Sequence, residues 1–70
     1  MGKTRHEVMP AIEGQRAAIR EHIAKYNNYV YPQDKEFALK TIERCQSNIE
    51  SLKAQCNQYI ESSWEDNWTP

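Results

Sequence analysis

The residue types that most often carry chemistry are few in this chain and lie far apart. His6 and His22 are sixteen residues apart, and Cys45 and Cys56 are eleven apart. Zinc sites in proteins need three or four closely arranged ligands, which this spacing does not supply. On one helix the two thiols would be separated by about 16 Å of rise, too far for a disulfide, so we expect reduced packing residues, with pairing across a parallel dimer as the alternative. The sequence predicts no metal, no cofactor and no catalytic residue.

A pair of arginines offers a different chemistry. Arg16 and Arg20 are four residues apart and therefore neighbours on a helix, where they could contact phosphates or an acidic protein surface. Tyrosines that follow them could stack on bases, namely Tyr26, Tyr29 and Tyr31. The competing interpretation is a solvated helix face, with the tyrosines packing the turn. Nucleic-acid or nucleotide binding is therefore kept as the alternative function.

The C-terminal segment is the least ordinary part of the chain. Trp64 and Trp68 are four residues apart and flank the acidic pair Glu65 and Asp66. Because tryptophan is enriched at binding hot spots, these four residues are the candidate contact site for a partner protein, with the carboxylates setting its orientation. In the alternative interpretation this segment folds back and covers the open end of the helices.

Length and composition limit the size of the core. Leu, Ile, Val and Phe together make up 11 of the 70 residues. A chain this short seldom gains more than about 3–5 kcal/mol from its core alone, so it needs a disulfide, a metal or association with another chain. The net charge is −1, but residues 1–25 carry +2 and the last seventeen carry −3. This asymmetry suggests attraction between the acidic end of one copy and the basic start of another.

The first half of the chain has the pattern of one helix. Thr4 and Glu7 fit a capping box at its start. Pro10 predicts a kink or a restart of the helix, because proline lacks the backbone N–H. Apolar residues then recur at helical spacing, at Val8, Ile12, Ile19, Ile23, Tyr26 and Val30. We expect a helix at about 4–27, followed by a turn at 28–32.

The second half has an unbroken heptad seam. Its members step by four and three residues, from Ala38 through Ile42, Cys45, Ile49, Leu52 and Cys56 to Tyr59. A helix at about 33–62 would carry this seam, and residues 63–70 would form a tail. Polar residues flank the seam without the opposite charges that would specify a partner helix: Thr41, Gln46, Asn48, Lys53 and Gln55.

Together these patterns predict an all-α fold, a single domain of residues 1–70 built as an antiparallel hairpin of two long helices. We expect it to self-associate into a four-helix bundle or coiled coil, with exposed apolar groups near the turn and the C-terminus as contacts. The expected function is non-catalytic protein–protein binding as a small adaptor, inhibitor or regulator, as a homodimer. The expected partners are a second copy and another protein, not a membrane, and the expected location is the cytoplasm because no signal sequence or membrane span is recognisable.

Overall fold

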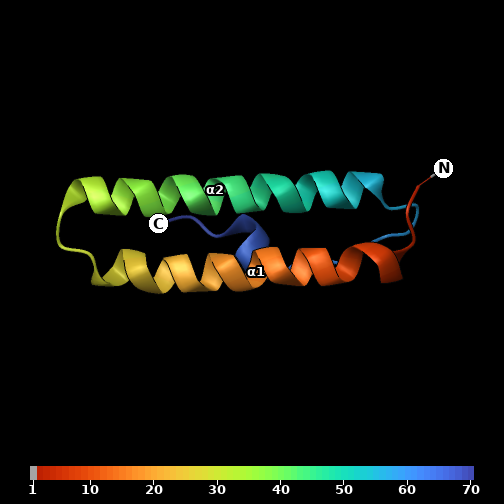
Figure 1. Cartoon of the computed structure of the whole chain (residues 1–70), viewed down its shortest axis with the longest axis horizontal. Coiled ribbons are helices and arrows are strands. Elements are labelled where there is room, and N and C mark those ends of the chain that lie inside the picture. The colour runs from red at the N-terminus through yellow and green to blue at the C-terminus, as the bar shows by residue number, and fades with distance from the viewer. Residues whose placement is uncertain (1) are drawn as a thin grey trace.

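The protein is a rod made of two antiparallel helices, described for residues 2–70 by a computed structural model (Figure 1). Helix α1 covers Arg5–Asn28 and helix α2 covers Pro32–Gln55, and a short 3₁₀ helix, η1, covers Trp64–Asn67. The backbone extends over 45 × 15 × 14 Å. The predicted all-α helical hairpin is confirmed.

Helix α1 begins at the predicted cap. The hydroxyl of Thr4 accepts a hydrogen bond from the backbone N–H of Glu7 at 3.3 Å. Of the two outcomes expected at Pro10, a kink or a restart, the restart does not occur, because α1 continues through this residue to Asn28. Pro10 and His6 are both exposed, so water can satisfy the carbonyl of His6 that proline leaves without a donor.

Helix α2 ends seven residues earlier than predicted, at Gln55 instead of residue 62. The heptad seam continues past this point in the sequence, yet Tyr59 is 83% exposed. The reason is the length of the opposing helix. Both helices have 24 residues and are joined by a short turn, so a longer α2 would project about 10 Å beyond α1 with nothing to pack against.

The N-terminal segment takes over the backbone hydrogen bonds at the end of α2. The N–H of Lys3 donates to the carbonyl of Gln55 at 2.7 Å, and the N–H of Asn57 donates to the carbonyl of Lys3 at 2.9 Å. The N–H of Arg5 donates to Oε1 of Gln58 at 2.8 Å. These contacts stop the helix and turn the chain back toward α1.

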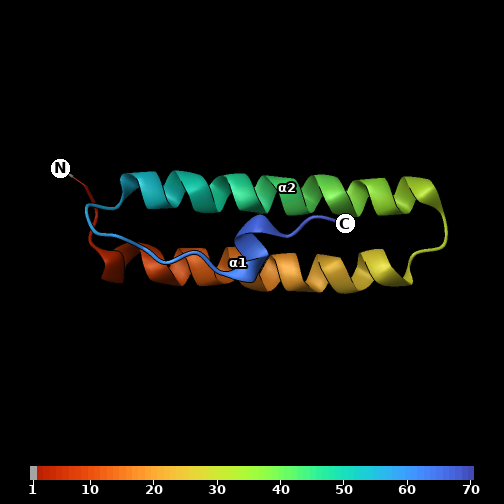
Figure 2. The same cartoon turned by 180° about the vertical axis from the view of Figure 1, so that it is seen from behind.

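The C-terminal tail, residues 56–70, folds back along the hairpin. Figure 2 shows it running along α1 from the open end and then crossing at η1 toward the space between the two helices. The sequence left two interpretations of this segment, a contact site for a partner or a segment that folds back over the open end. In the structure the tail folds back, and it covers the side of the hairpin as well as the open end.

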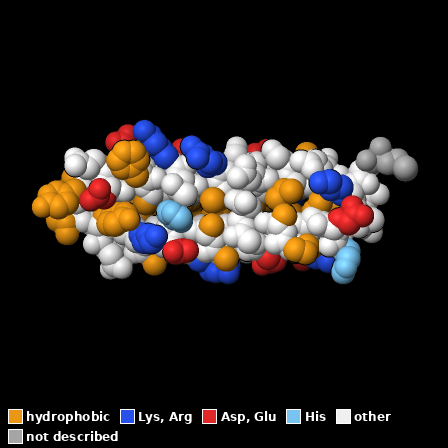
Figure 3. Space-filling model, in the orientation of Figure 1, with side chains coloured by type: hydrophobic (Ala, Val, Ile, Leu, Met, Phe, Trp, Pro, Cys, Tyr) orange, Lys and Arg blue, Asp and Glu red, His pale blue; other side chains and the backbone are white. Residues whose placement is uncertain are grey.

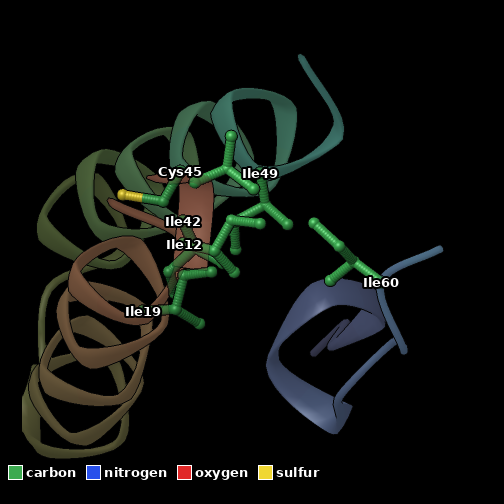
Figure 4. Packing of buried hydrophobic residues seen from close by; sticks show 7 residues of the cluster. Ile12, Ile19, Ile42, Cys45, Ile49 and Ile60 are labelled. Atoms are coloured by element: carbon green, nitrogen blue, oxygen red, sulfur yellow. The ribbon is translucent and has the colours of Figure 1, made fainter. Parts of the chain in front are cut away.

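The core is a single row of aliphatic side chains between the helices and the tail. Figure 4 shows Ile60 pointing from the tail toward the isoleucines of α1 and α2. The buried cluster consists of Val8, Ile12 and Ile19 from α1, Ile42, Cys45 and Ile49 from α2, and Ile60. No helix within residues 2–70 is both long enough and apolar enough to cross a membrane.

The thin core makes stability sensitive to single methyl groups. Ile12 has no accessible surface, so Ile12→Val should lower the free energy of unfolding by about 1 kcal/mol. Urea unfolding followed by circular dichroism measures this loss. Thr69→Ser, which also removes one methyl group but at an exposed position, is the matched control and should change stability by less than about 0.5 kcal/mol. Equal effects of the two substitutions would contradict the assigned core.

Gly14 offers a stabilising substitution. It lies inside α1, and a Cβ atom added there would meet nothing within 4 Å. Gly14→Ala should therefore raise the free energy of unfolding by about 0.5–1 kcal/mol, because alanine loses less backbone entropy in a helix. The same urea titration tests it, and a loss of stability would show that the helix is packed differently at this position.

Candidate functional site

The centre of the tail contact is an ion pair between residues fifty positions apart. The Nε and Nη2 atoms of Arg16 donate to the two carboxylate oxygens of Asp66 at 3.1 and 3.0 Å. Nη2 also donates to the carbonyl of Glu61 at 2.9 Å, and Nη1 donates to Glu13 at 3.0 Å. Arg16 is buried, so its guanidinium has exchanged water for these four contacts.

A second ion pair lies one helical turn further along α1. Nη1 of Arg20 donates to Oε1 of Glu65 at 2.8 Å, and the hydroxyl of Ser63 donates to the other carboxylate oxygen. The carboxylate of Glu65 is buried, whereas the side chain of Arg20 stays half-exposed. The two arginines therefore hold the two adjacent acids of η1, one each.

The acids are strongly held in their charged forms. Burial by itself raises the pKa of Asp66, but hydrogen bonds from Arg16, Lys53 and the backbone N–H of Ser63 outweigh burial and lower the pKa to about 2. For Glu65 burial likewise raises the pKa, and hydrogen bonds from Ser63, the backbone and Arg20 reverse the shift and lower it. Docking of the tail thus depends on ionised carboxylates.

Two polar residues of α2 complete the site, although their positions in the sequence did not indicate a role in it. Nε2 of Gln46 donates to the backbone carbonyls of Glu65 and Trp68 at 3.0 and 2.9 Å. Nζ of Lys53 donates to Asp66 at 2.9 Å and to the hydroxyl of Ser62 at 3.1 Å. The two residues are seven apart and flank the heptad seam, which places them on one side of α2.

The local fold of η1 has a signal in the sequence that the expectations above did not include. Ser63 and Asp66 form a capping box, in which each side chain accepts a hydrogen bond from the backbone of the other residue. The spacing Ser-x-x-Asp is the pattern for this motif. It predicts a helical turn that starts after Ser63 and presents Glu65 and Asp66 side by side.

The two tryptophans of the tail have different surroundings. The ring of Trp68 packs edge-on against Tyr26 of α1, with 5.9 Å between ring centroids and 78° between planes. Trp64 remains 57% exposed. Of the four residues predicted to contact a partner, Trp68, Glu65 and Asp66 are engaged within the chain, and Trp64 faces solvent.

The candidate anion-binding residues divide into two groups. Arg16, Arg20 and Tyr26 lie under the tail and contact it, as described above. Tyr29 and Tyr31 lie in the connection between α1 and α2, where Tyr31 is 66% exposed. In this arrangement the guanidinium groups are paired with carboxylates and the tyrosines are not gathered around them.

A second notable surface lies at the turn. Large apolar side chains gather at this end of the rod, at the left of Figure 3. We call this surface the apolar tip and define it by four residues: Tyr29, Val30, Tyr31 and Phe37. Val30 and Phe37 are 83% and 67% exposed. A hollow of about 280 Å³ adjoins the tip and is lined by Phe37, Tyr29, His22, Lys25, Asp34, Ala38 and Thr41.

The histidines and cysteines do not form a cluster in the part of the chain described. Cys45 and Cys56 are both free thiols, and burial raises the pKa of Cys45. The Nδ1 atom of His22 lies 2.8 Å from the carbonyl of Ala18. Residues 2–70 contain no group of three His, Cys, Asp or Glu side chains arranged to hold a metal ion.

Comparison of the chain with protein-family models, with curated proteins and with solved structures gave no match. The function is therefore inferred from two surfaces, the apolar tip and the tail site. The tail site consists of Glu65 and Asp66 with the helix residues that bind the tail, namely Arg16, Arg20, Gln46 and Lys53.

The tail site predicts a defined acid sensitivity. The pKa of Asp66 lies below that of an aspartate in an unfolded chain, so its ion pairs stabilise the fold above about pH 4 and are lost as the pH falls to about 2. Asp66→Asn should lower the free energy of unfolding by about 2 kcal/mol at neutral pH and flatten this acid dependence. Urea unfolding at several pH values measures both effects.

The matched control is Glu21→Gln, which removes an exposed carboxylate paired with Lys25 at 3.4 Å. This substitution should cost about 0.5 kcal/mol or less and leave the acid dependence of the wild type in place. An Asp66→Asn variant with the stability and acid profile of this control would show that the tail is not held by its ion pairs.

Proposed function

We propose that the protein is a non-catalytic binding module that acts through protein–protein contact and forms a homodimer through its apolar tip. The observation that carries this proposal is the exposure of four large apolar side chains at one end of the rod. Contiguous exposed apolar surface is uncommon on monomeric proteins and marks interaction sites. Aromatic residues, which form three quarters of the tip, are enriched in such interfaces.

The hollow beside the tip supports a second copy as the partner. In a two-fold symmetric dimer the same surface is used twice, so it must be complementary to itself, and a projection beside a recess meets this condition. The tip supplies exposed side chains, and the adjoining hollow of about 280 Å³ can receive the corresponding side chains of a partner. Both parts belong to one continuous surface, because Phe37 and Tyr29 are members of each.

The size of the contact sets its expected strength. The four tip side chains expose roughly 500 Å² in total. A stable interface buries about 800 Å² on each partner, so the contact must include the flanks of the hollow. We expect a weak dimer whose population depends on the protein concentration. A dimer joined at the tips leaves the tail sites of both copies accessible, which suits a small adaptor or regulator.

Replacing two tip residues tests the proposal. Val30→Ser with Phe37→Ser should remove self-association and leave the helical content unchanged, because both side chains are exposed in the single chain. Sedimentation equilibrium over a wide range of concentrations measures the association, and circular dichroism on the same samples measures the fold.

Trp64→Ser serves as the control, since it also removes an exposed aromatic side chain but lies outside the tip. This variant should dimerise like the wild type. A wild-type chain that stays monomeric up to millimolar concentration, or a tip variant that dimerises as well as the Trp64 variant, would contradict the proposed homodimer.

A further inference from the structure

The surface of α1 and α2 that the tail covers, which we call the groove, has the properties of a peptide-binding site that is already filled. Its polar groups come from the helices: Arg16 and Arg20 from α1, and Gln46 and Lys53 from α2. The helices also share a core of their own, since six of the seven residues in the buried cluster belong to α1 and α2. The groove is thus supported by contacts that do not involve the tail.

The ligand in this groove is recognised as a peptide. Gln46 donates to two backbone carbonyls, and Arg16 donates to a third, that of Glu61. All three acceptors are backbone carbonyl oxygens, which the backbone of a peptide supplies and a phosphate backbone does not. The side-chain contacts add a sequence requirement: an aliphatic residue at the position of Ile60, two adjacent acids at Glu65 and Asp66, and an aromatic residue at Trp68.

The tail is attached by an exposed segment whose hydrogen bonds go to the N-terminal residues Lys3 and Arg5 and not to the surface that the tail covers. Residues 57–59 are exposed and connect the end of α2 to Ile60. Beyond residues 57–59, the tail is held by ion pairs, by hydrogen bonds and by two apolar side chains. Ile60 packs into the core cluster, and Trp68 packs against Tyr26. The tail also leaves the groove partly open, because a hollow of about 460 Å³ remains between it and α2, lined in part by Gln46, Lys53, Ser62 and Asp66. A competing segment can therefore approach the site while the helices stay in place.

We propose that the groove between α1 and α2 binds an acidic segment of another protein, and that the chain's own tail is an autoinhibitory ligand that this segment displaces. The tail acts as a tethered competitor with an effective concentration in the millimolar range, so an external peptide binds weakly until the tail is released. This site lies on the side of the rod, apart from the apolar tip, so either proposal can fail without the other.

The test uses the full chain and a fluorescent peptide with the sequence of residues 59–70 as the probe. In the wild type the tail occupies the groove and the peptide should bind weakly. In a Glu65→Gln, Asp66→Asn variant, carried in the Gly14→Ala background to keep it folded, the internal tail is weakened. The peptide should then bind at least about tenfold more tightly, as measured by fluorescence anisotropy.

Two matched controls separate specific binding from a change in net charge. A Glu21→Gln, Glu36→Gln variant loses the same two charges at exposed positions, where both acids pair within their own helices, and should bind the peptide like the wild type. A peptide with Gln and Asn in place of Glu65 and Asp66 should bind the tail-weakened variant at least about tenfold more weakly than the acidic peptide.

Three results would overturn the proposal. The first is a folded tail-weakened variant that binds the peptide no better than the charge control. The second is equal binding of the acidic and the neutralised peptide. The third is displacement of the peptide by a single-stranded oligonucleotide at equal concentration, which would assign the groove to nucleic acid. If the variant unfolds, Trp68→Ala weakens the tail by removing its contact with Tyr26 instead and should also increase peptide binding.

Discussion

The ion pair between Arg16 and Asp66 is the interaction on which the arrangement of this molecule depends. A buried guanidinium is strongly unfavourable without a charged partner, and α1 places Arg16 on the side that the tail covers. Asp66 supplies both of its carboxylate oxygens to this arginine and also accepts a hydrogen bond from Lys53. One carboxylate therefore connects α1, α2 and the tail, and the path of residues 56–70 follows from satisfying these three charged groups.

The helices could be predicted from the sequence because their signals are local. The cap at Thr4, the apolar spacing and the heptad seam through Ile42 and Ile49 all concern residues a few positions apart. The end of α2 could not be predicted in the same way. It depends on where α1 begins and on hydrogen bonds that Lys3 makes to Gln55 and Asn57, which are more than fifty residues away.

The tail site was only partly predictable. The opposite charges of the two ends of the chain indicated that the ends attract each other. We expected this attraction to act between two copies, but in the structure the two ends of one chain contact each other. Segments of one chain meet at a higher effective concentration than separate copies, which favours the internal contact. Two arginines at i,i+4 spacing are also compatible with a solvated face, so the pattern alone does not show that Arg16 is covered. The Ser63 and Asp66 spacing was the one local signal for η1.

The return of the tail along the hairpin also determines the order in which the structure can assemble. Contacts between α1 and α2 near the turn close short loops, and helical hairpins of this kind form rapidly. The pair of Arg16 and Asp66 spans fifty residues, and the pair of Lys3 and Asn57 spans still more. In a disordered chain, closing these long loops costs more entropy than closing the short loops near the turn. A hairpin that has already formed reduces this cost, because it brings the ends of the chain close together. We therefore expect the hairpin to form before the tail docks, and the tail to separate before the helices during unfolding.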